Sequence, residues 1–236
     1  MNRSGVRVRA ALVIAMLSFA LPGVALAAKA RAKPAAAAAK PAATAPAKDA
    51  KPARAKEDIA IFAGGCFWCM ETDFEERPGI KEVISGYTGG TEVNPTYEEV
   101  SSHMTHHRES VEIHFDPSVV SYEKLVDIYW HSIDPTQDDG QFCDRGDSYR
   151  SAIFYRNAEQ KAVAEKSKHD IEASGVLKKP IVTELLPASK FWPAEDYHQD
   201  FWKKDPIRYR SYRFGCGRDQ RLVEIWGKDA AKPSVH

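Results

Sequence analysis

Residues 59–76 read IAIFAGGCFWCMETDFEE, and this stretch predicts a strand, a tight turn and a helix in succession. The apolar run 59–63 is typical of a buried strand, because it is short and stops at two glycines. Residues 66–76 contain no helix breaker and are followed by Pro78-Gly79, which indicates a helix that begins at Cys66. A cysteine therefore stands at the junction between the first strand and the first helix.

On both sides of this junction, strands and helices interleave without the long apolar strands of a doubly wound parallel fold. The sequence contains neither a GxGxxG motif nor a Walker loop. We expect an α+β domain, a single two-layer sandwich in which helices pack on a mixed or antiparallel sheet. Further strands are predicted at 83–88, 111–115, 151–155 and 181–186, and helices at 95–102, 122–132, 158–174 and 194–204.

The charge of the chain changes sign along its length. The 236 residues carry 33 Lys plus Arg and 33 Asp plus Glu, a formal net charge of zero. Residues 1–56 hold 11 basic residues and one acidic residue, whereas residues 57–236 hold 22 basic and 32 acidic residues. The neutral total argues against a dedicated nucleic-acid or anionic-membrane binder. All five Trp, all eight His and all four Cys lie in this part, so we expect it to form one domain.

The first 27 residues have the layout of a secretory signal peptide. Three arginines precede an apolar run over 10–21, and Ala25-Leu26-Ala27 offers a cleavage point after Ala27. The run is shorter than the roughly 20 residues of a permanent membrane span, which disfavours the alternative of an uncleaved anchor. We expect an exported protein, in the periplasm or cell envelope, with no stable membrane span in its mature form.

Residues 28–56 consist almost entirely of Ala, Lys, Arg and Pro. Such a composition supplies almost no large apolar side chains for a core, and its prolines interrupt any alanine helix. We therefore predict a disordered basic linker. Adhesion to an anionic envelope surface is the alternative to a plain spacer.

Cys66 stands at a position suited to a reactive thiol. Unpaired N–H groups and the helix dipole stabilise an anion at a helix N-terminus, so we expect the pKa of Cys66 to lie below its free value of about 8.5. Phe67 and Trp68 would supply an aromatic wall for a methyl or thioether group. The alternatives are a zinc site that joins the C-x-x-C pair to Cys143 and Cys216, a thioredoxin-like C-x-x-C, and structural disulfides.

Five motifs along the chain carry a resemblance to a known family. They are GCFW at 65–68 followed by Glu71, GYTGG at 86–90, NPTY at 94–97, YRS at 149–151 and AEDYHQ at 194–199. In this order, the chain resembles the A-type peptide-methionine sulfoxide reductases over residues 58–227. The resemblance implies a ferredoxin-like core, a catalytic domain at 57–236 and reduction of the S-epimer of methionine sulfoxide, free or in proteins. It implies no metal or organic cofactor.

The resemblance also assigns roles to individual residues. Cys66 would attack the sulfoxide sulfur, and Glu109 would act as the general acid, because a bare oxide is a poor leaving group. Burial beside the aromatic pocket would raise the pKa of Glu109 and keep it protonated. Tyr97 and Tyr149 match the two phenols that hydrogen-bond the sulfoxide oxygen, and Asp144 matches a carboxylate that supports the pocket.

Several cysteines are candidates for the resolving thiol. Attack by Cys66 would leave a sulfenic acid, which condenses with a second thiol to form a disulfide. The resemblance points to Cys216, between two glycines, whereas Cys69 is one helical turn from Cys66. A relay through both, or through Cys143, is the third possibility. A thioredoxin-like partner or another dithiol would reduce the final disulfide.

The chain departs from the commoner family pattern just before the acid, where it reads HHR at 106–108 instead of Gly-His-Ala. An inward Arg108 would favour the charged form of Glu109 and oppose its protonation. Because adjacent strand residues alternate sides, we expect Arg108 to face outward.

A different class of function uses the same cysteines. Cys66 and Cys69 could serve a thiol-disulfide oxidoreductase or a redox-regulated binding module. Such a protein needs neither an aromatic methyl slot nor a protonated acid, so Trp68 and Glu109 discriminate between the two classes.

Overall fold

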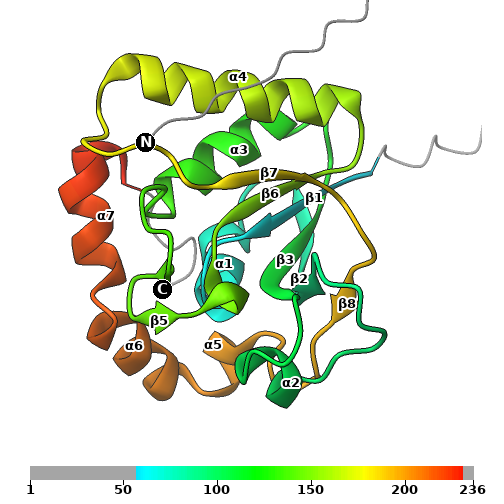
Figure 1. Cartoon of the computed structure of the whole chain (residues 1–236). Helices are drawn as coiled ribbons and strands as arrows, with labels where there is room; N and C mark the ends of the chain where they lie inside the picture. The colour runs from blue at the N-terminus through cyan, green and yellow to red at the C-terminus, as the bar shows by residue number, and fades with distance from the viewer. Residues whose placement is uncertain (1–56, 231–236) are drawn as a thin grey trace, which may run out of the picture. The chain divides into compact units, whose positions relative to one another are not determined.

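The computed structural model describes residues 57–230, where helices surround a six-stranded mixed sheet (Figure 1). The predicted signal peptide at 1–27 and the predicted linker at 28–56 lie outside the described residues. Within residues 57–230, no helix combines the length and the apolar character that crossing a membrane requires.

The sheet confirms the predicted α+β class. Its strands lie in the order β7-β6-β1-β3-β2-β8, and every neighbouring pair is antiparallel except β6 and β7. The succession β1-α1-β2-β3-α3-β6 gives the βαββαβ arrangement of a ferredoxin-like core. The strands are β1 (Asp58–Ala63), β2 (Ile80–Thr88), β3 (Arg108–Phe115), β6 (Ala152–Tyr155), β7 (Glu184–Pro187) and β8 (Trp192–Pro193).

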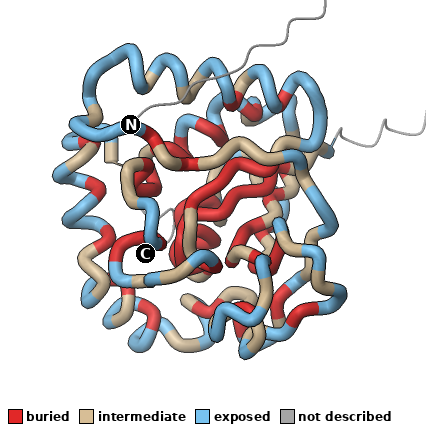
Figure 2. Tube along the Cα trace, in the orientation of Figure 1, coloured by how far each residue is buried: buried red, intermediate tan, exposed pale blue. Residues whose placement is uncertain are grey.

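The central strand β1 is apolar on both faces. Ala60 and Phe62 join the larger core, whereas Ile61 and Ala63 pack with Phe154 on the opposite face. The larger core also takes side chains from α1 (Phe67–Phe74), α3 (Tyr122–His131) and α4 (Ala158–Ser174). Figure 2 shows the resulting contrast between the buried sheet and the exposed outer helix α4.

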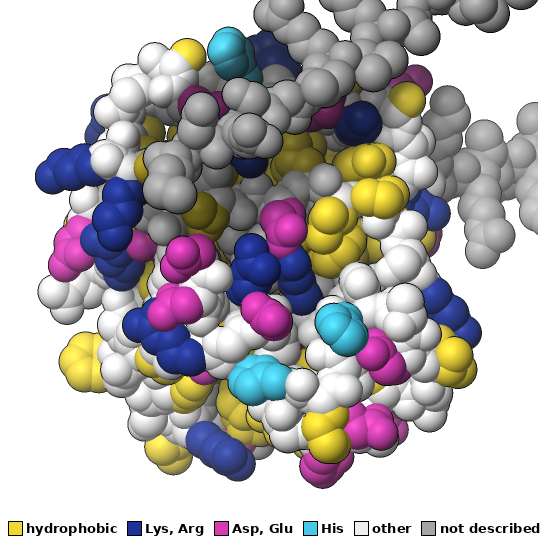
Figure 3. All heavy atoms as spheres, in the orientation of Figure 1, with side chains coloured by type: hydrophobic (Ala, Val, Ile, Leu, Met, Phe, Trp, Pro, Cys, Tyr) yellow, Lys and Arg dark blue, Asp and Glu magenta, His cyan; other side chains and the backbone are white. Residues whose placement is uncertain are grey.

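Helix α4 has the bounds that the sequence predicts. The side chain of Asn157 accepts a hydrogen bond from the backbone N–H of Gln160, and Gly175 ends the helix with a φ of 67°. An Asn N-cap and a left-handed glycine are strong signals of helix boundaries, so the bounds of α4 can be predicted from local sequence. Its outward face is exposed. Figure 3 shows acidic and basic side chains intermixed on one face of the domain.

One predicted helix, 194–204, is wrong. Only α5 (Phe201–Lys204) is helical, because the preceding residues bind the sheet instead. The side-chain amide of Gln199 pairs with the backbone of Ser85, donating to its carbonyl at 2.8 Å and accepting from its N–H at 2.9 Å. The predicted strand 181–186 is also shorter and shifted, because β7 begins only at Glu184.

Several elements near the candidate site have no counterpart in the sequence prediction. A hairpin of β4 (Gly140–Gln141) and β5 (Asp144–Arg145) leads into the short 3-10 helix η1 (Asp147–Tyr149). Helices α6 (Pro206–Gly215) and α7 (Arg218–Trp226) follow α5. Helix α2 (Tyr97–Ser101), by contrast, lies within the predicted helix 95–102, between β2 and β3. These elements bring distant side chains to the β1–α1 junction.

Candidate active site

Cys66 is the N-cap residue of α1, at the end of a two-glycine turn after β1. Gly65 has a φ of 84°, and a Cβ there would lie 2.6 Å from the Cβ of Gln141. Both the backbone conformation and the available space therefore require glycine. The turn buries Cys66, which is 6% exposed, and directs α1 away from it.

The expected low pKa of Cys66 is wrong for the unliganded protein. Burial raises the pKa of the Cys66 thiol well above its usual range, and the hydrogen bond to Cys69 and the charge of Glu109 raise it further. That hydrogen bond lowers the pKa of Cys69, helped by the charge of Arg218. Desolvation thus outweighs the helix N-terminus at Cys66, and Cys69 is the better placed of the two to hold a negative charge.

Glu109 on β3 is buried, as expected. The carboxyl is 3% exposed, and its Oε2 accepts a hydrogen bond from the backbone N–H of Phe67 at 3.0 Å. Burial raises its pKa to about 8, more than the Phe67 hydrogen bond lowers it. At neutral pH, Glu109 therefore holds a proton beside the residue that follows Cys66.

Arg108 turns away from Glu109, as strand alternation predicts. Its guanidinium pairs with the carboxylate of Glu184 and donates to the carbonyl of Ser151 at 3.3 Å. The Arg108 side chain therefore lies on the opposite face of the sheet from Glu109. Its partners cover most of it, and it is 12% exposed.

Tyr97 and Tyr149 converge on the same place from different elements. Tyr97 begins α2, which has a capping box between Thr96 and Glu99, and Tyr149 ends η1. Burial raises the pKa of Tyr97 to about 12, and the charges of Glu109 and Cys66 contribute. Burial and the charge of Glu109 likewise raise the pKa of Tyr149. Both phenols are therefore neutral hydrogen-bond donors.

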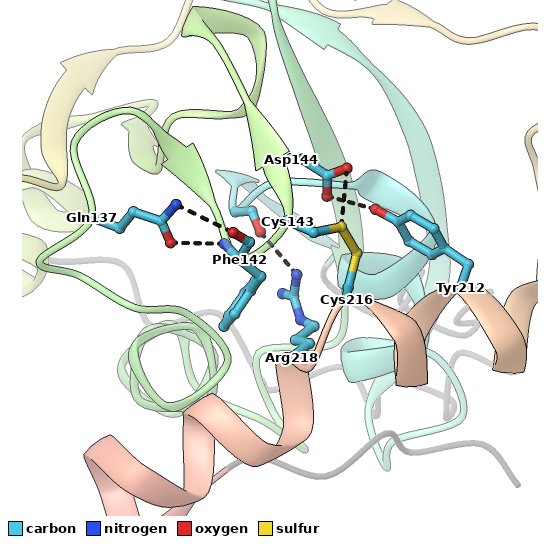
Figure 4. The surroundings of a disulfide bond; sticks show 8 residues. Gln137, Phe142, Cys143, Asp144, Tyr212, Cys216 and Arg218 are labelled. Atoms are coloured by element: carbon cyan, nitrogen blue, oxygen red, sulfur yellow. Dashed lines mark hydrogen bonds between the residues drawn. A yellow bond between two sulfur atoms is a disulfide. The ribbon is translucent and has the colours of Figure 1, made fainter.

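Asp144 lies at the edge of this group, on the β4–β5 hairpin. Its Oδ2 accepts a hydrogen bond of 2.5 Å from the hydroxyl of Tyr212 on α6 (Figure 4). Burial raises the pKa of Asp144, and the Tyr212 hydrogen bond opposes that rise. The charge of Asp144 acts on both Cys66 and Tyr149, which places it within electrostatic reach of the thiol.

Phe67 and Trp68, the residues predicted to supply an aromatic wall, pack among other aromatic rings. The Phe67 ring is 5.9 Å from that of Tyr87, and the Trp68 indole stacks on Phe201 with centroids 3.8 Å apart. The indole N–H donates to Nδ1 of His198 at 3.1 Å. Burial lowers the pKa of His198 to about 4, so its ring is neutral and Nδ1 is free to accept. The indole is thus held from its face and from its edge.

Three residues that position the candidate site were not predicted from the sequence. The carboxylate of Glu195 accepts from the backbone N–H of Tyr97 and from the hydroxyl of Tyr87, both at 2.8 Å. Glu195 and His198 belong to the AEDYHQ motif, but the sequence alone assigns neither residue a function. The fully buried Arg218 donates to the carbonyl of Gly64 at 3.2 Å and so braces the turn before Cys66. No local pattern marks Arg218.

The four cysteines form two unlike pairs. Cys66 and Cys69 are free and buried, whereas Cys143 and Cys216 are joined by a disulfide bond across 73 residues of sequence. The bonded pair offers no thiolate to a metal, so the four-cysteine zinc site is not formed in this state. One disulfide is present among the described residues, where the structural alternative supposed two.

A buried thiol pair, a protonated carboxyl, two neutral phenols and packed aromatic rings are the groups of a thiol-dependent oxidoreductase. The family model described as peptide methionine sulfoxide reductase matches residues 58–230. The chain therefore belongs to the peptide methionine sulfoxide reductase family.

Curated relatives and solved structures agree with this assignment. The MsrA of Bacillus licheniformis is 57% identical over 73% of this chain and 96% of its own length, and a Listeria monocytogenes MsrA is 60% identical over 71% and 94%. Methionine sulfoxide reductase A of Corynebacterium diphtheriae matches with a TM-score of 0.57 and 34% identity, covering 64% of this chain and 76% of that one. The reduced form of Mxr1 from Saccharomyces cerevisiae matches with a TM-score of 0.61 and 27% identity, covering 66% and 90%.

Proposed function

We propose that this protein reduces the S-epimer of methionine sulfoxide, free or in proteins, to methionine. The observation that carries the proposal is the buried Glu109, whose raised pKa supplies a proton within one residue of the Cys66 thiol. A sulfoxide oxygen needs such a proton in order to leave its sulfur. Relatives of more than half identical sequence carry the name peptide methionine sulfoxide reductase.

In this reaction the substrate methyl group packs against Phe67 and Trp68, and Tyr97 and Tyr149 donate hydrogen bonds to its oxygen. Glu109 gives its proton to that oxygen as the Cys66 sulfur attacks. The attack forms a bond between the Cys66 sulfur and the substrate sulfur, and the protonated oxygen then passes to Cys66 as a sulfenic acid. The bonds from the substrate sulfur to the oxygen and to Cys66 break, and methionine leaves with the electron pair, so its sulfur is reduced by two electrons and Cys66 is oxidised by two.

Cys66 must lose its own proton before it attacks, because only the thiolate is strongly nucleophilic. The hydrogen bond from Cys66 to Cys69 supplies a path for that proton, since Arg218 and Arg213 favour negative charge on Cys69. The charges of Glu109 and Asp144 oppose a thiolate on Cys66. Protonated Glu109 therefore has two effects. It removes a charge that opposes the Cys66 thiolate, and it supplies the proton for the sulfoxide oxygen.

We assign the resolving step to Cys69. It lies one helical turn after Cys66 and already contacts its sulfur, so condensation with the sulfenic acid releases water without a large movement. Cys216, the candidate favoured by resemblance, is held by Cys143 in this structure. An external thioredoxin-like dithiol then restores the thiols.

Stereospecific turnover tests the proposed activity. The full mature chain is incubated with dithiothreitol and either pure methionine S-sulfoxide or pure methionine R-sulfoxide, and methionine is measured by chromatography. Steady formation from the S-epimer, at least about a hundredfold faster than from the R-epimer, is expected of a site that orients oxygen and methyl separately. Equal rates, or no methionine from the S-epimer, would refute the proposal.

We also propose that the enzyme works after export, in the periplasm or cell envelope. The support is the arginine-led apolar run and the Ala25-Leu26-Ala27 triplet. The mass of the protein purified from a bacterial periplasm is expected to fit a chain that begins at Ala28. Recovery only as the full chain in the cytosol would contradict export.

A further inference from the structure

One edge of the central sheet is only partly paired. Strand β8 lies at that edge and pairs with β2 at Gly86 and Tyr87 alone (Figure 1). Next to them, the carbonyl of Ser85 accepts from the backbone N–H of Ala194, and both backbone groups of Ser85 bind the side-chain amide of Gln199. No described strand lies beside the earlier residues of β2 on this side. The edge is therefore open from Ser85 back toward the start of β2.

Val83 has a backbone donor and a backbone acceptor that face the open edge. In an antiparallel strand, the backbone groups of every second residue point to the same side. Ser85 directs its N–H and C=O away from β3, toward Gln199, so Val83 directs its own groups the same way. Val83 is 9% exposed, and the described residues offer these groups no hydrogen-bond partner on that side. An added strand would supply the partners that Gln199 supplies to Ser85.

A groove of about 410 Å³ follows this open edge. Residues 80–84 of β2 form one wall, and residues of the segment 193–200 form the opposite wall. After Pro193 the chain leaves β2 instead of continuing beside it, so the groove occupies the place of a continued β8. Its volume falls within the roughly 300–1,000 Å³ of common ligand sites. The groove and the open edge together form a place where an extended peptide can pair with β2.

The groove is lined by more acidic than basic side chains. Its two lysines are already paired. Lys81 binds Glu57, and Lys203 binds Glu75 and Asp200. Three further carboxylates line the groove without an ion pair among the described residues: Glu76, Glu82 and Asp196. A peptide with positive side chains complements this lining, whereas an acidic peptide is repelled by it.

The segment that closes the groove also borders the active site. On one side, Glu195 and His198 hydrogen-bond residues of that site. On the other side, Asp196 and Gln199 line the groove. A single stretch of chain therefore separates the two places, and about three or four extended residues, at roughly 3.3 Å each, span a layer of about 10 Å.

We propose that this groove binds a lysine- or arginine-bearing extended segment of an oxidised protein substrate, which adds a strand to β2 while its methionine sulfoxide lies beside Cys66. This inference rests on the proposed function and names its preferred substrates, which carry basic residues near the oxidised methionine. Free methionine sulfoxide is too short to reach the groove. The basic segment lowers the KM of a peptide and leaves kcat unchanged, because it binds equally well before and during oxygen transfer.

Peptide kinetics test this preference. Each peptide carries methionine S-sulfoxide, a Gly-Ser-Gly spacer and either Lys-Val-Lys-Val or Glu-Val-Glu-Val, placed before the sulfoxide in one pair and after it in the other. Dithiothreitol is the reductant. In at least one pair, the lysine peptide is expected to have a KM about tenfold lower than the glutamate peptide, the effect of a few part-exposed charge contacts. Equal KM values in both pairs would overturn the inference.

Two charge reversals locate the effect. Glu82→Lys is expected to remove the preference for the lysine peptide and to leave the KM for free methionine S-sulfoxide unchanged, because Glu82 lines the groove. Glu172→Lys is the matched control, because Glu172 is exposed on α4. If Glu82→Lys kept the preference, or if Glu172→Lys removed it, the groove would not be the docking site. Failure of the wild type to reduce free methionine S-sulfoxide would instead count against the proposed function.

Amide hydrogen exchange tests the added strand. The Cys66→Ser chain, which leaves the sulfoxide unreduced, is saturated with the lysine peptide, and exchange is followed by NMR. The N–H of Val83 is expected to exchange at least about tenfold more slowly, because it gains a hydrogen bond. The N–H of Ser85, already bonded to Gln199, is the reference. Peptide binding that leaves the exchange of Val83 unchanged would contradict pairing with β2.

Discussion

Cys66→Ser is expected to abolish methionine formation, lowering kcat by at least about four orders of magnitude, as loss of a nucleophile does in other enzymes. A cysteine sulfur can take up the sulfoxide oxygen and form a sulfenic acid, whereas a serine hydroxyl has no corresponding product. Turnover of methionine S-sulfoxide with dithiothreitol measures the loss.

Cys69→Ser provides the matched comparison, since it removes a buried sulfur from the same helix. Without a reductant this variant is expected to form one methionine per protein and to retain a sulfenic acid on Cys66, detectable with a dimedone probe. Formation of methionine by Cys66→Ser at the rate of Cys69→Ser would show that Cys66 is not the nucleophile.

Glu109→Gln is expected to slow oxygen transfer by about 10²- to 10⁴-fold, the usual contribution of a general acid. Glutamine keeps the size of the side chain and its oxygen can still accept a hydrogen bond from the backbone N–H of Phe67, but its amide is too weak an acid to protonate the leaving oxygen. The wild-type rate should fall as the pH rises through about 8, because Glu109 then loses its proton. Rates of methionine release in a single turnover, measured from pH 6 to 10, should lack this decline in the variant.

Glu71→Gln is the control for that profile. Glu71 is also buried with a pKa of about 8, but its carboxylate binds the Ser85 hydroxyl and the Asp200 backbone N–H. Its variant is expected to keep the alkaline decline. If Glu109→Gln left the rate unchanged, or if Glu71→Gln removed the decline, general-acid catalysis by Glu109 would be wrong.

Loss of stability is not expected to cause the lower activity of Glu109→Gln. The folded-state pKa of Glu109 lies above its unfolded value, so the folded protein binds more protons and its free energy of unfolding falls between about pH 4.5 and about pH 8. Glutamine removes this penalty. The variant should therefore be at least as stable as the wild type at pH 8.

The elements predicted well from sequence carry strong local signals. The turn at Gly65 needs glycine for both φ and space, and α4 has an Asn cap and a terminal Gly. The alternation on β3 correctly placed Glu109 inward and Arg108 away from it. In each case the decisive interaction lies within a few residues or follows from the period of the element.

The errors arise from long-range packing. The pKa of Cys66 was misjudged because Phe201 and Tyr209, on helices α5 and α6, complete the burial of the two free cysteines. Helix α6 was not predicted, so its desolvation could not be included. The predicted helix at 194–204 fails for a related reason, since Gln199 gains more from the backbone of Ser85 than from a helix.

The central claim is that Cys66 takes the oxygen from methionine S-sulfoxide, and a reductant-free reaction tests it most directly. The mature chain, with Cys66 and Cys69 reduced and the Cys143–Cys216 disulfide intact, is mixed with excess methionine S-sulfoxide, quenched and mapped by mass spectrometry. We predict one methionine per protein and a new disulfide between Cys66 and Cys69. No methionine, or methionine formed while Cys66 remains a free thiol, would contradict the claim.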